Sequence, residues 1–91
     1  MLRAIIGLGN PGSRYVNTRH NAGFMVIDEL AQRWQISFKP GKGNYVFAKS
    51  AQRDAILMKP TTYMNNSGQA VRHLTDYFKI EVEDCMIVFD D

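Results

Sequence analysis

The chain has 91 residues, of which 45% are hydrophobic and 22% charged, proportions that suit one soluble globular domain over residues 1–91 and exclude a disordered tail. Its apolar runs are a few residues long, which excludes a membrane span of roughly 20 residues, and Met1-Leu2-Arg3 leads into a strand-like run rather than a signal peptide. The net charge of +2 divides into +6 over residues 1–53 (eight basic, two acidic) and −4 over residues 54–91 (three basic, seven acidic). A basic half suits a phosphate-rich partner or a solvated surface equally well.

The beginning of the chain predicts a strand, a polar loop and an amphipathic helix. Residues 2–8 are a short apolar run that ends at glycines, which is typical of a buried strand. A polar loop follows over residues 9–20. From about Asn21 onward, apolar residues recur at three- and four-residue steps, which predicts a helix with this buried face: Phe24, Ile27, Leu30, Ala31 and Trp34.

The middle of the chain predicts a β-hairpin. Residues 39–43, rich in Lys, Pro and Gly, predict an interruption of regular secondary structure after the helix. Residues 44–50 and 54–58 are then expected to form two strands joined by a short polar turn. Pro60 argues against extending the second strand into the polar loop that follows it, because proline has no N–H to donate to a neighbouring strand.

A second helix and a last strand complete the expected elements. Asn66 or Ser67 is positioned to cap a helix whose buried stripe is Ala70, Val71, Leu74, Tyr77 and Phe78. Residues 85–89 form one more apolar run, in which Cys85, the single cysteine, is expected to be a small buried side chain.

The order of these elements (strand, helix, two strands, helix, strand) predicts an α/β fold with a mixed β-sheet flanked by helices. Three polar clusters each follow the end of a predicted strand: residues 9–20, residues 59–66, and Asp90 with Asp91. Open α/β sheets usually place their sites at the carboxyl ends of strands. We therefore expect these clusters to meet there.

The stretch GLGNPG at residues 7–12 satisfies the G-x-G-x-x-G pattern of dinucleotide-binding turns. That site requires the third glycine to lead directly into a helix whose N–H groups hold the pyrophosphate. No helical stripe follows Gly12, and Pro11 removes one donor. The match is accidental, and the glycines instead allow Asn10 to be held at the rim of a loop, although an ordinary Asn-Pro-Gly turn explains the tripeptide as well.

His20 is the residue whose side chain is best suited to catalysis. It precedes a predicted helix, lies off the apolar stripe and has no metal-ligand spacing to another His or Cys. A neutral imidazole there can act as a general base, and Asp90 is a candidate to orient it. A lone surface histidine is the simpler interpretation when the other loops are ignored.

Long stretches of the chain carry a family pattern: GLGNPG at 7–12 followed by Tyr15, TRHNAG at 18–23, KPTTYMNNSG at 59–68, and the terminal Asp90-Asp91. In composition, order and spacing these closely resemble bacterial peptidyl-tRNA hydrolases, over essentially the whole sequence. Members of that family are considerably longer, so the resemblance also implies a chain truncated at its C-terminus.

The resemblance implies hydrolysis of the ester between a peptide and the 3′-terminal ribose of tRNA, with no cofactor and no metal. By the family pattern His20 activates water, Asp90 stabilises its protonated form, and Asn10 contacts the peptide. The substrate-binding residues implied are Tyr15, Tyr63, Met64 and Asn65. The implied partner is peptidyl-tRNA, and we expect a monomer in the cytoplasm with no membrane partner. The alternatives are a truncated, non-catalytic module that binds the tRNA acceptor end or a peptide and, more remotely, a nucleotide-binding domain.

Overall fold

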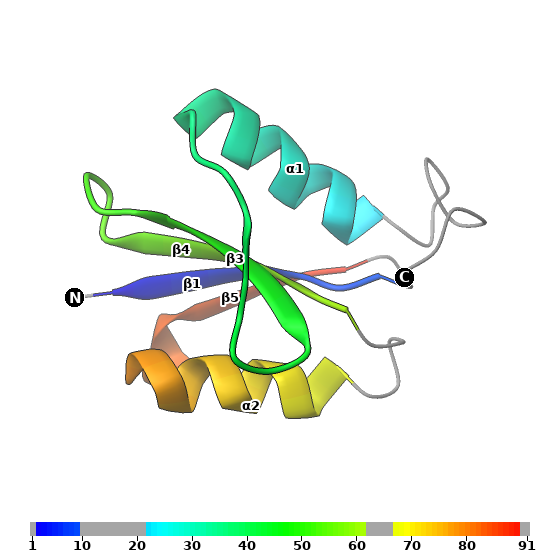
Figure 1. Cartoon of the computed structure of the whole chain (residues 1–91), viewed down its shortest axis with the longest axis vertical. Helices are drawn as coiled ribbons and strands as arrows, with labels where there is room; N and C mark the ends of the chain where they lie inside the picture. The colour runs from blue at the N-terminus through cyan, green and yellow to red at the C-terminus, as the bar shows by residue number, and fades with distance from the viewer. Residues whose placement is uncertain (1, 10–21, 62–66, 90–91) are drawn as a thin grey trace.

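The computed structural model describes residues 2–9, 22–61 and 67–89, and these form one sheet with a helix on each face (Figure 1). The strands and helices in chain order are β1 (Arg3–Gly7), α1 (Ala22–Trp34), β2 (Lys39–Pro40), β3 (Tyr45–Ser50), β4 (Ala55–Pro60), α2 (Ser67–Phe78), the short 3₁₀ helix η4 (Val82–Asp84) and β5 (Cys85–Val88). Neither α-helix among these residues is long and apolar enough to span a membrane.

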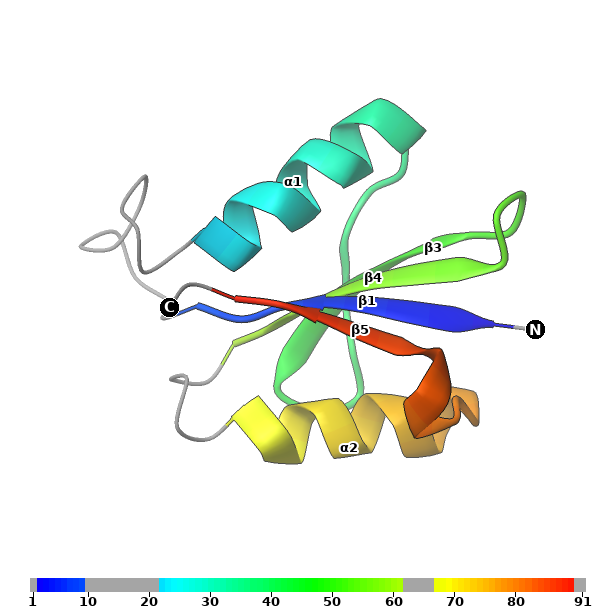
Figure 2. The ribbon, with the colours of Figure 1, turned by 180° about the vertical axis from the view of Figure 1, so that it is seen from behind.

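The sheet is mixed, as the order of elements predicts. Its strands lie in the order β2-β3-β4-β1-β5. The central strand β1 runs parallel to both β4 and β5, whereas β3 runs antiparallel to β4 and β2 antiparallel to β3. Figure 2 shows α1 and α2 on opposite faces of this sheet. The expectation of a mixed sheet flanked by helices is confirmed.

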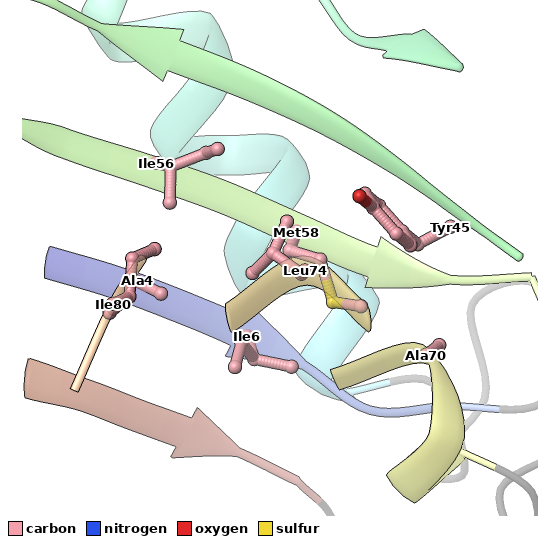
Figure 3. Packing of buried hydrophobic residues seen from close by; sticks show 8 residues of the cluster. All are labelled: Ala4, Ile6, Tyr45, Ile56, Met58, Ala70, Leu74 and Ile80. Atoms are coloured by element: carbon pink, nitrogen blue, oxygen red, sulfur yellow. The ribbon is translucent and has the colours of Figure 1, made fainter. Parts of the chain in front are cut away.

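Two cores hold the helices to the sheet, because side chains alternate between its faces along each strand. On one face, Ile27 and Ala31 of α1 pack with Leu57 of β4. On the other face, Ala70 and Leu74 of α2 complete a larger cluster (Figure 3), whose remaining fully or nearly buried members are Ala4, Ile6, Tyr45, Ile56, Met58 and Ile80. The predicted helical stripes therefore contribute to both cores, through Ile27 and Ala31 of α1 and through Ala70 and Leu74 of α2.

Pro60 belongs to β4, so the expectation that it ends the strand earlier is wrong. It lies opposite Tyr45, and the next pair outward is Asn44 with Thr61, whose N–H donates to the Asn44 carbonyl at 2.9 Å. Hydrogen-bonded and non-hydrogen-bonded pairs alternate in an antiparallel ladder, so the position of Pro60 requires no N–H on that side. Pairing with β1 already stops at Met58.

Three further expectations need correction. Lys39 and Pro40 do not simply interrupt regular secondary structure but form the two-residue edge strand β2. Tyr77 is half exposed, because it lies at the margin of α2, where its ring stacks on His73 and meets the edge of Phe78. Cys85 is only partly buried, because β5 forms the edge of the sheet.

Candidate functional site at the carboxyl ends of the strands

The carboxyl ends of β1, β4 and β5 lie together at one end of the sheet, here called the carboxyl edge, because these strands are parallel. The register places Ile6 beside Met58 of β4, and Gly7 beside Val88 of β5. One further hydrogen bond, from the Leu8 N–H to the Val88 carbonyl at 2.9 Å, extends the β1–β5 ladder beyond the last paired residues. The first turns of α1 and α2 lie at this same end of the sheet (Figures 1 and 2).

Glycines allow the first turn of α1 to touch the ends of β1 and β5. A Cβ atom on Gly23 would collide with the carbonyl oxygens of Val88 and Leu8, and would lie 2.8 Å from the Leu8 nitrogen. A Cβ atom on Gly7 would collide with the Gly23 carbonyl oxygen and lie 2.5 Å from Cγ1 of Ile27. Close backbone approach between β1 and α1 is thus the role of Gly7.

The predicted site residues lie in segments that join these described ends. Asn10, Tyr15 and His20 fall between Gly9 and Ala22, and Tyr63, Met64 and Asn65 fall between Thr61 and Ser67. Asp90 follows Phe89. All seven lie outside the described residues, so their roles stay predictions. The structure establishes that the elements flanking these segments share one end of the sheet: β1, β4 and β5 end there, and α1 and α2 begin there.

Lys59 is a charged residue near this edge whose contacts the sequence analysis missed. Its Nζ donates to Oδ1 of Asp28 on α1 at 2.6 Å, and its side chain is only 22% exposed. The ammonium also lies 4.4 Å from the ring centroid of Phe38 and 5.9 Å from that of Phe24. Lys59 therefore ties β4 to α1. No local signal predicts this pair, because its members are 31 residues apart.

Replacing Lys59 with Met is expected to lower the free energy of unfolding by about 1 kcal/mol, since it removes a partly buried ion pair and a cation–π contact. Urea denaturation measures this loss. The matched control is Arg33→Met, which removes the exposed Arg33–Glu29 pair and should cost less than about 0.5 kcal/mol. Equal losses in the two variants would show that Lys59 has no special role in joining β4 to α1.

A cleft of about 820 Å³ lies at the opposite end of the sheet, at the amino ends of β1, β4 and β5. Its charged lining includes Arg3, Arg53, Glu83 and Asp84. Arg53 lies over the ring of Trp34, 4.7 Å from its centroid. This cleft is separate from the carboxyl edge, where the family-pattern segments begin and end.

Cys85 lines that cleft, and its environment opposes ionisation of the thiol. Burial raises the pKa of the Cys85 thiol, and the neighbouring carboxylates of Asp84 and Glu83 raise it further. The Sγ–H group donates to the Glu81 carbonyl at 3.5 Å. Since the thiolate is the reactive form, Cys85 is not suited to be a nucleophile at neutral pH.

Cys85 is accordingly expected to react with iodoacetamide more slowly than free cysteine at neutral pH. Asp84→Asn should accelerate the reaction because it removes a negative charge beside the thiol. Asp76→Asn, on α2 and paired with Arg72, should leave the rate unchanged. Alkylation rates measured by mass spectrometry test this, and an unchanged rate in Asp84→Asn would refute the electrostatic explanation.

Within residues 2–9, 22–61 and 67–89, no group of three or more His, Cys, Asp or Glu side chains is arranged to hold a metal ion.

The fold and this edge define an α/β protein whose candidate site lies beyond the carboxyl ends of its parallel strands. The peptidyl-tRNA hydrolase family model matches residues 4–91, and the chain belongs to this family. It is 52% identical over 92 aligned positions to a peptidyl-tRNA hydrolase of Bacillus cereus strain Q1, covering 99% of this chain and 50% of that protein. It is 51% identical over 89 positions to one from Lachnospira eligens, covering 96% of this chain and 48% of that protein.

A solved structure agrees with these relatives. The crystal structure of peptidyl-tRNA hydrolase from Acinetobacter baumannii superposes with a TM-score of 0.91 at 38% identity, covering 99% of this chain and 47% of that one. The described fold is thus the fold of the matching part of that enzyme. The chain spans about half the length of the relatives that it matches.

Proposed function

We propose that this chain carries the hydrolytic site of a peptidyl-tRNA hydrolase and cleaves the ester between a peptide and the 3′-terminal ribose of tRNA. The products are a free tRNA and a peptide with a free carboxylate. Family membership supports this reaction, because the relatives over the matched region are named for it. The substrate is accordingly peptidyl-tRNA, a cytoplasmic molecule, and the chain acts as a monomer in that compartment.

His20 is the general base in this proposal. Its neutral imidazole takes a proton from water as the water attacks the ester carbonyl, and Asp90 stabilises the imidazolium that forms. Amide N–H groups such as those of Asn10 and Asn65 stabilise negative charge on the carbonyl oxygen. An ester is activated enough for this chemistry without a metal ion.

The remaining proposed residues bind the substrate. Tyr15 and Tyr63 offer aromatic faces for a nucleobase or a peptide side chain, and Met64 and Asn65 line the same site. Asn10 contacts the peptide and helps to distinguish a blocked amino group from a free one.

The observation that carries the proposal is the meeting of strand and helix ends at one sheet edge. Gly9 and Ala22 flank the segment that contains His20, Thr61 and Ser67 flank the segment that contains Asn65, and Phe89 precedes Asp90. The parallel pairing of β1 with β4 and β5 places the strand ends together. Residues widely separated in sequence thereby become available to a single site, as in other open α/β sheets.

The experiment compares N-acetyl-aminoacyl-tRNA with the unblocked aminoacyl-tRNA as substrates for the purified chain. The proposal predicts release of the blocked amino acid and little release of the free one. Filter binding of the same tRNAs distinguishes the alternative function. A folded chain that binds the blocked tRNA but does not accelerate its hydrolysis would be a binding module, and the proposed activity would be wrong.

A further inference from the structure

The segment that forms β2 and β3 is basic and contains no acid. Residues 30–53 include no Asp or Glu, although the whole chain has nine acids. The basic residues of this segment are Arg33, Lys39, Lys42, Lys49 and Arg53. Lys39 lies in β2, Lys42 in the turn between β2 and β3, and Lys49 in β3, and all three are exposed. The positive charge of the first half of the chain is thus concentrated beside these two strands.

The strand register places Lys39 and Lys49 on the same face of the sheet, the face on which α2 packs. Lys39 lies opposite Phe47, and Lys49 lies opposite Ile56. Ile56 belongs to the core under α2, Phe47 packs against that core, and residues opposite each other in an antiparallel pair point to the same face. The two lysines are therefore diagonal neighbours across β2 and β3, roughly 7–8 Å apart, with the half-buried Phe47 between them.

Lys42 extends this row of positive charges to the carboxyl edge. Its turn is closed by the Gly41 N–H, which donates to the Tyr45 carbonyl at 2.9 Å, and the turn lies beside α2 (Figure 1). Within this turn, the Asn44 carbonyl accepts from the N–H of Thr61, which follows the end of β4. The three lysines, here called the lysine strip, thus begin beside the carboxyl edge and follow β3 away from it for roughly 16 Å.

The charge of the lysine strip is not neutralised within residues 2–9, 22–61 and 67–89. None of its three lysines forms an ion pair with a described residue, whereas Lys59, Arg33 and Arg72 each pair with an acid. Unpaired cations around an aromatic ring are complementary to RNA, because phosphates contact the cations and a ribose or a base packs on the ring. Protein interfaces are in contrast depleted in lysine, so a protein partner is less favoured.

We propose that the lysine strip binds phosphates in the tRNA part of the substrate, while the ester is cleaved at the carboxyl edge. The inference rests on the proposed function for the identity of this RNA. A tRNA whose 3′ end enters the carboxyl edge beside Thr61 continues past Lys42 and then along β3, where Lys39 and Lys49 contact its backbone. These contacts hold the RNA equally in the ground state and in the transition state, so they lower KM rather than raise kcat.

The test compares two double variants, Lys39→Gln/Lys49→Gln and Arg3→Gln/Arg33→Gln. The second removes the same charge from exposed positions on the α1 side, since Arg33 lies in α1 and Arg3 shares the face of Ile5. Filter binding of deacylated tRNA is measured as salt is raised from about 50 mM. The strip variant should bind about tenfold or more weakly, and its slope of log affinity against log salt should fall by about 1.4–1.8, the value for two lost phosphate contacts. The control should bind like the unmodified chain.

Three outcomes would overturn the inference: equal weakening in the two double variants, an unchanged salt slope in the strip variant, or competition by polyglutamate as strong as by tRNA, which would indicate an acidic polypeptide as partner. Hydrolysis of N-acetyl-aminoacyl-tRNA is measured separately, and its KM should rise in the strip variant. Binding that depends on the strip without any hydrolysis would refute only the proposed function, whereas hydrolysis with an unchanged KM in that variant would refute only this inference.

Discussion

His20→Ala should lower the rate of ester hydrolysis by about 10²- to 10⁴-fold, the contribution typical of a well-placed general base. The proposal makes His20 the group that accepts the proton of the attacking water, and alanine cannot accept it. Steady-state release of N-acetyl-amino acid from its tRNA ester measures the effect. Urea denaturation of the same variant should show an unchanged free energy of unfolding, so that the loss is chemical rather than structural.

His73→Ala provides a matched control, because His73 is the other histidine of the chain. Its ring stacks on Tyr77, and its Nδ1 lies 3.3 Å from the hydroxyl of Tyr45. Its loss is expected to lower stability by about 1 kcal/mol through the lost hydrogen bond and to leave turnover intact. A full rate in His20→Ala, or equal loss in both variants, would remove His20 from the mechanism.

Gly23→Ala should reduce the free energy of unfolding by about 3 kcal/mol or more, because the new methyl group cannot be accommodated without moving backbone. Its Cβ would collide with the carbonyl oxygens of Leu8 and Val88, and no flexible side chain is available there to give way. The displacement would separate α1 from the ends of β1 and β5. We therefore expect the variant to lose hydrolysis along with stability.

Gly68→Ala tests the same substitution in the corresponding position of the other helix. Gly68 is the second residue of α2, as Gly23 is of α1, but a Cβ there would meet no atom within 4 Å. Alanine should raise stability by about 0.5–1 kcal/mol, the difference in helix propensity. Thermal unfolding of both variants measures the contrast, and similar changes in the two would contradict the close-packing explanation for Gly23.

The fold was largely predictable because periodicity encodes which face of an element is buried. The three- and four-residue steps from Phe24 to Trp34 predict α1 correctly, since Ile27 and Ala31 are buried against the sheet. Rules based on local sequence fail where the structure of a residue depends on a neighbouring strand. Pro60 is tolerated in β4 only because of its register against Tyr45, which no local pattern contains.

The apolar run 85–89 illustrates a second limit. Hydrophobicity predicts a strand there, and β5 exists, but burial depends on what lies beside the strand. With β1 on one side only, Met86 and Phe89 are exposed.

The candidate site, like the fold, could be predicted only in part from the sequence. The order of elements predicts that the three polar clusters follow the carboxyl ends of strands. The parallel pairing confirms that β1, β4 and β5 end on the same side of the sheet. The contact between Lys59 and Asp28 is a tertiary one between α1 and β4, and no spacing rule finds it. The roles of His20, Asp90 and Asn10 come from family resemblance and stay predictions, since these residues lie beyond the described ranges.

The most direct measurement is the hydrolysis of N-acetyl-aminoacyl-tRNA with the purified 91-residue chain in excess, beside the same substrate in buffer alone. Circular dichroism on the same sample establishes that the chain is folded. We expect release of N-acetyl-amino acid well above the spontaneous rate, and return to that rate in His20→Ala. A folded chain that leaves the ester to hydrolyse at its spontaneous rate would contradict it.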